Sequence, residues 1–220
     1  MMPTKTFFRL AAVALIGGGV LTLLINVVLT PALPQNVSFA TTAASIIFLW
    51  RQSASALAAV LLLIGCVGLY LRQAERAAHF GVFAFTLVLV GTALALGVEW
   101  KEVFDVHDFA RRAPDALNAL DAKKGLTLSN VGAIIAISTF MLGWILLAIT
   151  TLRTHAANRI AAWMVIGGFL ATPLLRPVLP GLWGAAVGNA ILGSGLAWLG
   201  YDIFPSEIDE RKLHASPNTG

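Results

Sequence analysis

Charged residues divide the chain into long apolar runs. Between Leu10 and Trp50 there is no Asp, Glu, Lys or Arg, and comparable runs follow through most of the chain. A helix needs about 20 apolar residues to cross a bilayer, where the backbone must satisfy its own hydrogen bonds. Alternating strand patterns are absent, so the pattern predicts an all-α, polytopic transmembrane bundle of about six helices. The predicted spans are residues 8–30, 52–71, 78–98, 129–152, 159–175 and 181–201.

The first apolar run is longer than one span. Pro31 and Pro34 end the first helix, because proline interrupts the helical hydrogen-bond ladder. The following stretch, 39–50, is apolar but too short to cross, which predicts an interfacial or re-entrant segment before the second helix. The fifth span is short and carries Pro173 near its end. We interpret it as a kinked crossing, with a re-entrant pair as the alternative.

Composition narrows the function classes. Apolar residues make up 58% of the chain and charged residues 12%, whereas a soluble domain carries about 25% charge. An ordinary soluble enzyme, a disordered chain and a nucleic-acid-binding module are therefore excluded, and the lipid bilayer is the expected partner. The single cysteine, Cys66, can form neither an intramolecular disulfide nor a thiolate metal site.

Basic residues in short connections set the expected orientation. Alternate connections each carry two of them, at Lys5 and Arg9, Arg72 and Arg76, Arg153 and Arg159, and Arg211 and Lys212. This alternation places both termini in the cytoplasm. Residues 1–204 then form one transmembrane domain and 205–220 a polar cytoplasmic tail. The first span exceeds a typical signal-peptide core in length, so we expect it to be a retained anchor.

The outer loop, residues 99–128, is the one sizeable polar connection. Pro114 and Gly125 bracket the segment 115–124, in the order typical of a helix start and end. We expect a short helix that rests on the membrane surface or over the mouth of the bundle. Residues 103–112 are expected to extend the third helix into water.

Glycines on the last span predict close helix packing. In lipid, helices associate by close approach of their backbones, which small residues allow. We expect contacts within the bundle, with a homo-oligomer or a membrane-protein partner as the alternative. The predicted packing residues are Gly181, Gly184, Gly188 and Gly195.

A few polar residues share one predicted depth near the outer face. Glu99, Arg51 and Arg176 end or begin spans there, and Asn26 and Asn189 lie in the outer halves of their spans. Polar groups in membranes tend to face the bundle interior. These residues would line an outer cavity, with Glu99 as counter-ion or proton acceptor and an arginine as anion contact. The favoured interpretation is simpler: snorkelling charges and interhelical amide hydrogen bonds.

No pattern indicates a catalytic, metal or cofactor site. The histidines are scattered, at His79, His107, His155 and His214, without the spacing of zinc or haem ligands. Phosphate-binding loops, nucleophile elbows and paired glutamates within a span are also missing from the sequence. We therefore predict no catalytic residue, no metal and no cofactor.

Three segments resemble small bacterial six-helix integral membrane proteins with no established activity. They are GLYLRQAE at 68–75, LRTHAANRIAAWMVIGG at 152–168 and GLAWLGYDIF at 195–204. The resemblance implies a bacterial cytoplasmic-membrane fold and transfers no catalytic residue to this chain.

Three functions are compatible with this sequence. A structural or interaction component of the membrane is favoured and predicts a dry bundle with an exposed glycine face. A small transporter or channel-like protein predicts polar residues gathered around a hydrated outer cavity. An intramembrane lipid-modifying enzyme, the second alternative, requires an acid, base or nucleophile converging at one depth.

Overall fold

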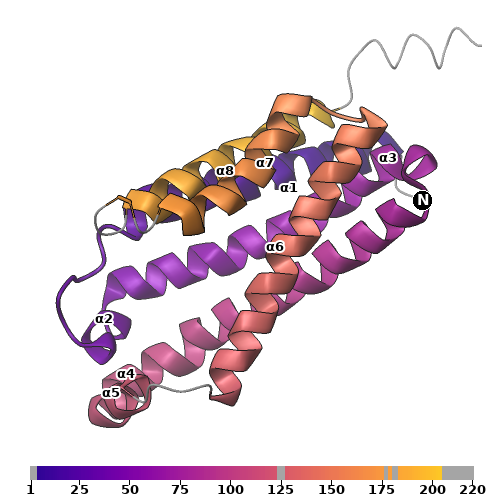
Figure 1. Ribbon diagram of the computed structural model, residues 1–220. Helices are drawn as coiled ribbons and strands as arrows, with labels where there is room; N and C mark the ends of the chain where they lie inside the picture. The colour runs from indigo at the N-terminus through magenta and orange to yellow at the C-terminus, as the bar shows by residue number, and fades with distance from the viewer. Residues whose placement is uncertain (1–3, 123–126, 176–177, 180–182, 205–220) are drawn as a thin grey trace, which may run out of the picture.

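The computed structural model describes residues 4–122, 127–175, 178–179 and 183–204, and these residues form helices without a strand (Figure 1). The predicted all-α class is therefore confirmed. The helical elements in chain order are α1 (Thr4–Leu24), η1 (Ile25–Leu29), α2 (Phe39–Ala43), α3 (Ile46–Lys101), η2 (Glu102–Val106), α4 (His107–Arg112), α5 (Pro114–Asp121), α6 (Leu128–Thr154), α7 (Arg159–Leu175) and α8 (Trp183–Asp202).

Three helical segments are long and apolar enough to cross a membrane, as judged by length and composition among the described residues. They are Lys5–Leu29, Ile46–Arg112 and Leu128–Thr154. The apolar helix α7 is shorter. The chain therefore contains helices compatible with membrane association.

Helix α3 is two antiparallel helices joined by one sharp turn. Its backbone leaves the helical region at Ala78, where φ is 46° and ψ is −156°. The rings of Tyr70 and Phe85, on either side of this turn, stack with their centroids 4.2 Å apart. The expected polar connection before the third span is thus helical up to residue 77, because it contains good helix formers.

The second helix begins earlier than the sequence pattern predicted. It starts at Ile46 rather than at residue 52, because the Ser45 hydroxyl accepts a hydrogen bond from the Phe48 N–H at 3.2 Å and caps the helix. The expected interfacial segment at 39–50 is instead divided between the short helix α2 and the first turns of α3.

The long helices form a ring. Helix α8 contacts α1 and α7, α6 contacts α7 and α3, and α1 contacts α3. A Cβ placed at Gly65 would meet Leu15 of α1, and one placed at Gly143 of α6 would meet Val88. The first half of α3 (46–77) therefore packs on α1, and the second half (79–101) packs on α6.

The ring has two distinct ends. We call the end where α1 begins and α8 finishes the terminal end; the turn of α3 and the α6–α7 connection also lie there (Figure 1). Ala11 and Ile203 both approach Gly68 at this end. The opposite end carries α2, α4 and α5, and we call it the cap end.

The cap is a small apolar cluster joined by polar contacts. Ala40, Ala43, Phe48, Ala110 and Leu117 are buried together. The Ala40 N–H donates to Asn118 Oδ1 at 3.0 Å, and His107 Nδ1 donates to the Ala43 carbonyl oxygen at 2.7 Å. Helices α2, α4 and α5 are thereby held against one another.

The outer-loop helix begins at Pro114, as predicted, and packs on α2. The extension expected at 103–112 is also helical, since η2 and α4 continue α3 without a break. Four predicted features lie outside the described residues: Gly125, Arg176, Gly181 and the tail 205–220.

Close backbone contact between α1 and α8 predicts opposite effects for two glycine substitutions. A Cβ at Gly19 would lie 2.4 Å from the Ala197 backbone nitrogen, whereas one at Gly132 would meet nothing within 4 Å. Gly19→Ala should lower the free energy of unfolding by about 1–3 kcal/mol. Gly132→Ala should raise it by about 0.5–1 kcal/mol, because alanine favours the helix. Thermal unfolding in detergent measures both, and equal effects of the two substitutions would contradict the packing described here.

The turn at Ala78 predicts a stabilising glycine. A positive φ with an extended ψ is costly for alanine, by about 1–3 kcal/mol, and is ordinary for glycine. Ala78→Gly should therefore raise the unfolding temperature. Ala74→Gly, one turn earlier in regular helix, is the matched control and should lower it. A decrease with both substitutions would show that residue 78 is helical.

Candidate functional site

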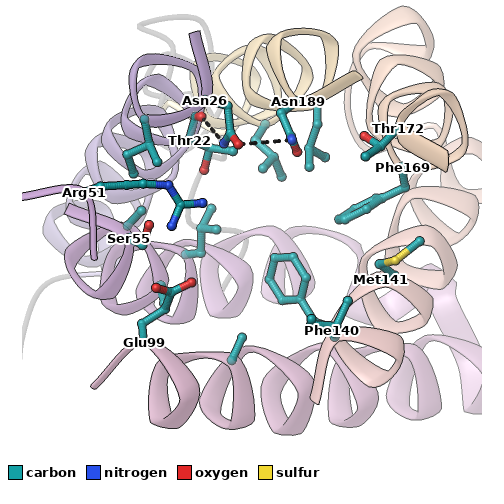
Figure 2. Close-up of a pocket in the computed structure, with 18 of the residues that line it drawn as sticks. Thr22, Asn26, Arg51, Ser55, Glu99, Phe140, Met141, Phe169, Thr172 and Asn189 are labelled. Carbon is teal, nitrogen blue, oxygen red and sulfur yellow. Dashed lines mark hydrogen bonds between the residues drawn. The ribbon is translucent and has the colours of Figure 1, made fainter. Parts of the chain in front are cut away.

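The cap-end half of the ring contains a cavity of about 440 Å³ (Figure 2). Every long helix of the ring contributes to its wall. Its polar lining consists of Thr22, Asn26, Arg51, Ser55, Glu99, Thr172 and Asn189, and its apolar lining includes Leu62, Phe140, Met141, Phe169, Leu192 and Leu196.

Two opposite charges face each other on one side of the cavity. Arg51, on the first half of α3, and Glu99, on the second, point toward one another in Figure 2. They come together because the turn at Ala78 makes the two halves antiparallel. No ion pair joins them: among the described residues the ion pair found is Arg112 with Asp108, at 2.9 Å.

Neighbouring side chains hold Arg51 but leave one oxygen of Glu99 unpaired. The Arg51 Nε donates to Thr30 Oγ1 at 3.0 Å, and its Nη1 donates to Gln52 Oε1. Glu99 Oε2 is buried and has no hydrogen-bond donor. A buried acceptor without a donor is costly, so a donor from outside the protein would be bound favourably here.

Two amides connect α8 to the N-terminal helix above the cavity. Asn189 Nδ2 donates to Asn26 Oδ1 at 3.1 Å, and Asn26 Nδ2 donates to the Thr22 carbonyl oxygen at 2.8 Å. Figure 2 places this pair between the charged side and the apolar side of the cavity. The interhelical hydrogen bond fixes both amides at the cavity wall.

The wall opposite the charges is apolar and aromatic. Phe140 of α6 and Phe169 of α7 meet edge to face with centroids 5.7 Å apart, and Met141 lies beside them (Figure 2). Behind Phe140, the buried Trp144 donates its indole N–H to Thr92 Oγ1 at 3.2 Å. This wall is therefore supported by packing and by a buried hydrogen bond.

The structure brings together four of the five polar residues that the sequence singled out: Asn26, Arg51, Glu99 and Asn189 all line the cavity. Arg176 lies outside the described residues. The sequence reasoning missed Ser55 and Thr22, although each lies one helical turn from a predicted residue. It also missed the aromatic wall, because nothing in the pattern distinguishes these residues from lipid-facing ones.

Three glycines of the predicted packing set are among the described residues, and all three are buried within the single chain. A Cβ at Gly188 would meet Thr172 of α7, at 2.4 Å from its hydroxyl oxygen. A Cβ at Gly195 would lie 2.8 Å from the Cβ of Met164. Gly184 is buried as well. The close contact at Gly188 brings Thr172 to the cavity wall.

The described residues include no group of three or more His, Cys, Asp or Glu side chains placed to hold a metal ion. In comparisons with known proteins, no family model matches the chain, and neither does a curated protein or a solved structure. The chemistry of the cavity therefore has to be argued from its own residues: one cation, one carboxyl group, hydroxyls, two amides and an aromatic wall.

The amide pair predicts a measurable coupling energy. Single Asn26→Ala and Asn189→Ala substitutions and their combination should give a coupling of about 0.6 kcal/mol, the average for interhelical hydrogen bonds in membranes, and at most about 1.7 kcal/mol. Unfolding in detergent by urea or heat measures it. Asn189→Ala combined with Thr86→Ala is the control, because the Thr86 hydroxyl bonds only its own helix. Additive effects of the two asparagine substitutions would contradict the contact.

Proposed function

We propose that the chain is a six-span integral membrane protein of a bacterial cytoplasmic membrane and acts as a small transporter. Its solute site is the cavity, open to the outer face. The observation that carries this proposal is the convergence of Asn26, Arg51, Glu99 and Asn189 from separate helices onto one cavity. Polar side chains gathered inside a membrane bundle mark substrate pathways.

Pairs of basic residues at two short connections support this orientation. The turn of α3 and the α6–α7 connection lie together at the terminal end (Figure 1). Arg72 and Arg76 lie on the last helical turns before the first of them, and Arg153 and Arg159 flank the second. Basic residues in short connections favour the cytoplasmic side. The terminal end would then face the cytoplasm. The cap end, which contains the cavity, would face the outside.

The two other functions have less support. An interaction component stays a prediction, but its expected exposed glycine face is not supported by Gly188 and Gly195, which pack on α7. A lipid-modifying enzyme needs a base within reach of a nucleophile. Among the described residues, Glu99 is the one carboxyl group that lines the cavity, and it makes no hydrogen bond to a lining hydroxyl.

Cysteine labelling tests the proposed site. In a Cys66→Ala background, Ser55→Cys places a thiol on the cavity wall, and Leu57→Cys places one on an exposed part of the same helix, where Leu57 is 52% exposed. A membrane-impermeant thiol reagent, added outside right-side-out vesicles, should label residue 55 through the hydrated cavity. Residue 57 should stay unlabelled, since it would face lipid.

Three results would contradict the proposal. Labelling of residue 57 at the rate of residue 55 would mean that this helix is bathed in water rather than in lipid. Labelling of residue 55 only from the cytoplasmic side would reverse the orientation, and absence of labelling from both sides would mean that the cavity is dry.

A further inference from the structure

We infer that the cavity binds a zwitterionic amphiphile, a molecule with an ammonium group and an oxyanion at one end and an apolar body at the other. This inference rests on the proposed function, because it names the class of solute for the same site. Three features of the cavity lead to it: an arginine and a carboxyl group that no ion pair joins, an apolar wall across from them, and exposed lining residues at the apolar end.

The side chains of Arg51 and Glu99 determine which headgroup the cavity would bind. Arg51 uses Nε and Nη1 on Thr30 and Gln52, and no described hydrogen bond engages its Nη2, which is left for an oxyanion. Glu99 Oε2 lacks a donor, and an ammonium group would supply one. An anion alone or a cation alone would leave one of the two charges unpaired in a weakly polar environment, which is costly. A zwitterion pairs both.

The apolar wall opposite Arg51 and Glu99 indicates that the rest of the ligand is apolar. Phe140, Met141 and Phe169 lie across the cavity from Arg51 and Glu99 (Figure 2). Leu192 and Leu196 complete this apolar side. A volume of about 440 Å³ is within the range of about 300–1,000 Å³ typical of small-molecule sites. A ligand that matches this lining is polar at one end and apolar at the other.

Residues of α6 and α7 that line the apolar end of the cavity are also exposed at the surface of the bundle. Ile137 of α6 and Pro173 of α7 both line the cavity and are exposed, Ile137 by 53%. The same headgroup chemistry occurs in single-chain zwitterionic lipids and in free apolar amino acids. Lining residues that are exposed on the proposed lipid side favour the single-chain lipid.

Ligand-induced stabilisation tests the inference. The full chain, purified in a non-ionic detergent, is heated with one of four probes: short-chain lysophosphatidylethanolamine, lysophosphatidylglycerol of the same chain length, the matching alkylamine, or phenylalanine. A ligand that binds the folded state raises the unfolding temperature according to its affinity. The zwitterionic lipid should bind at least tenfold more tightly than either singly charged analogue.

Single substitutions assign the headgroup contacts. Glu99→Gln should remove the preference for the zwitterionic lipid over lysophosphatidylglycerol, and Arg51→Gln should remove its preference over the alkylamine. Asp105→Asn is the matched control, because Asp105 is an exposed acid at the cap end that does not line the cavity, and it should keep both preferences. A second measurement keeps both Arg51 and Glu99 unchanged. Each of the four probes is tested for its ability to protect a cysteine at residue 55 from the thiol reagent.

The outcomes separate this inference from the proposed function. Stabilisation by phenylalanine and not by the lipid would support a zwitterionic ligand but would identify it as a free amino acid rather than a lipid. Equal binding of a singly charged analogue, or labelling at residue 55 that none of the probes reduces, would overturn the inference and leave the hydrated cavity standing. Absence of both labelling and binding would overturn the proposed function as well.

Discussion

The structure depends on close backbone contact between α8 and the two helices beside it. A Cβ at Gly193 would lie 2.6 Å from the Gly19 carbonyl oxygen of α1, and one at Gly168 of α7 would lie 2.5 Å from the Leu192 backbone nitrogen. Lipid solvates apolar side chains as well as a protein interior does, so such contacts, rather than apolar burial, hold helices together in a membrane. They join the first and last long helices and close the ring.

Closure of the ring determines where polar groups can lie. Once α8 is held against α1, Asn189 meets Asn26 across the interface at 3.1 Å. The turn at Ala78 brings Glu99 to the level of Arg51 in the same way. Both pairs of residues lie in the cap-end half of the ring. This half is therefore polar on one side of the cavity and aromatic on the other. The cavity and its two-sided lining follow from these two features of the backbone.

The sequence predicted the helices well because charged residues are excluded from long apolar runs. It did not predict the start of α3 at Ile46, which depends on a single serine cap, or the replacement of a polar loop by one residue with positive φ at Ala78. It identified Asn26 and Asn189 because amides are rare in such runs. Phe140 and Phe169 could not be identified, since facing a cavity or facing lipid leaves the same apolar signature in the sequence.

The central claim is that this ring is threaded through a membrane with its terminal end in the cytoplasm and its cavity at the outer face. Reporter domains fused to the two chain ends and inserted at Asn36, in the connection before α2, measure this directly. The account predicts that both ends report from the cytoplasm and that Asn36 reports from the outside. Chain ends in opposite compartments, or Asn36 on the same side as the ends, would contradict it.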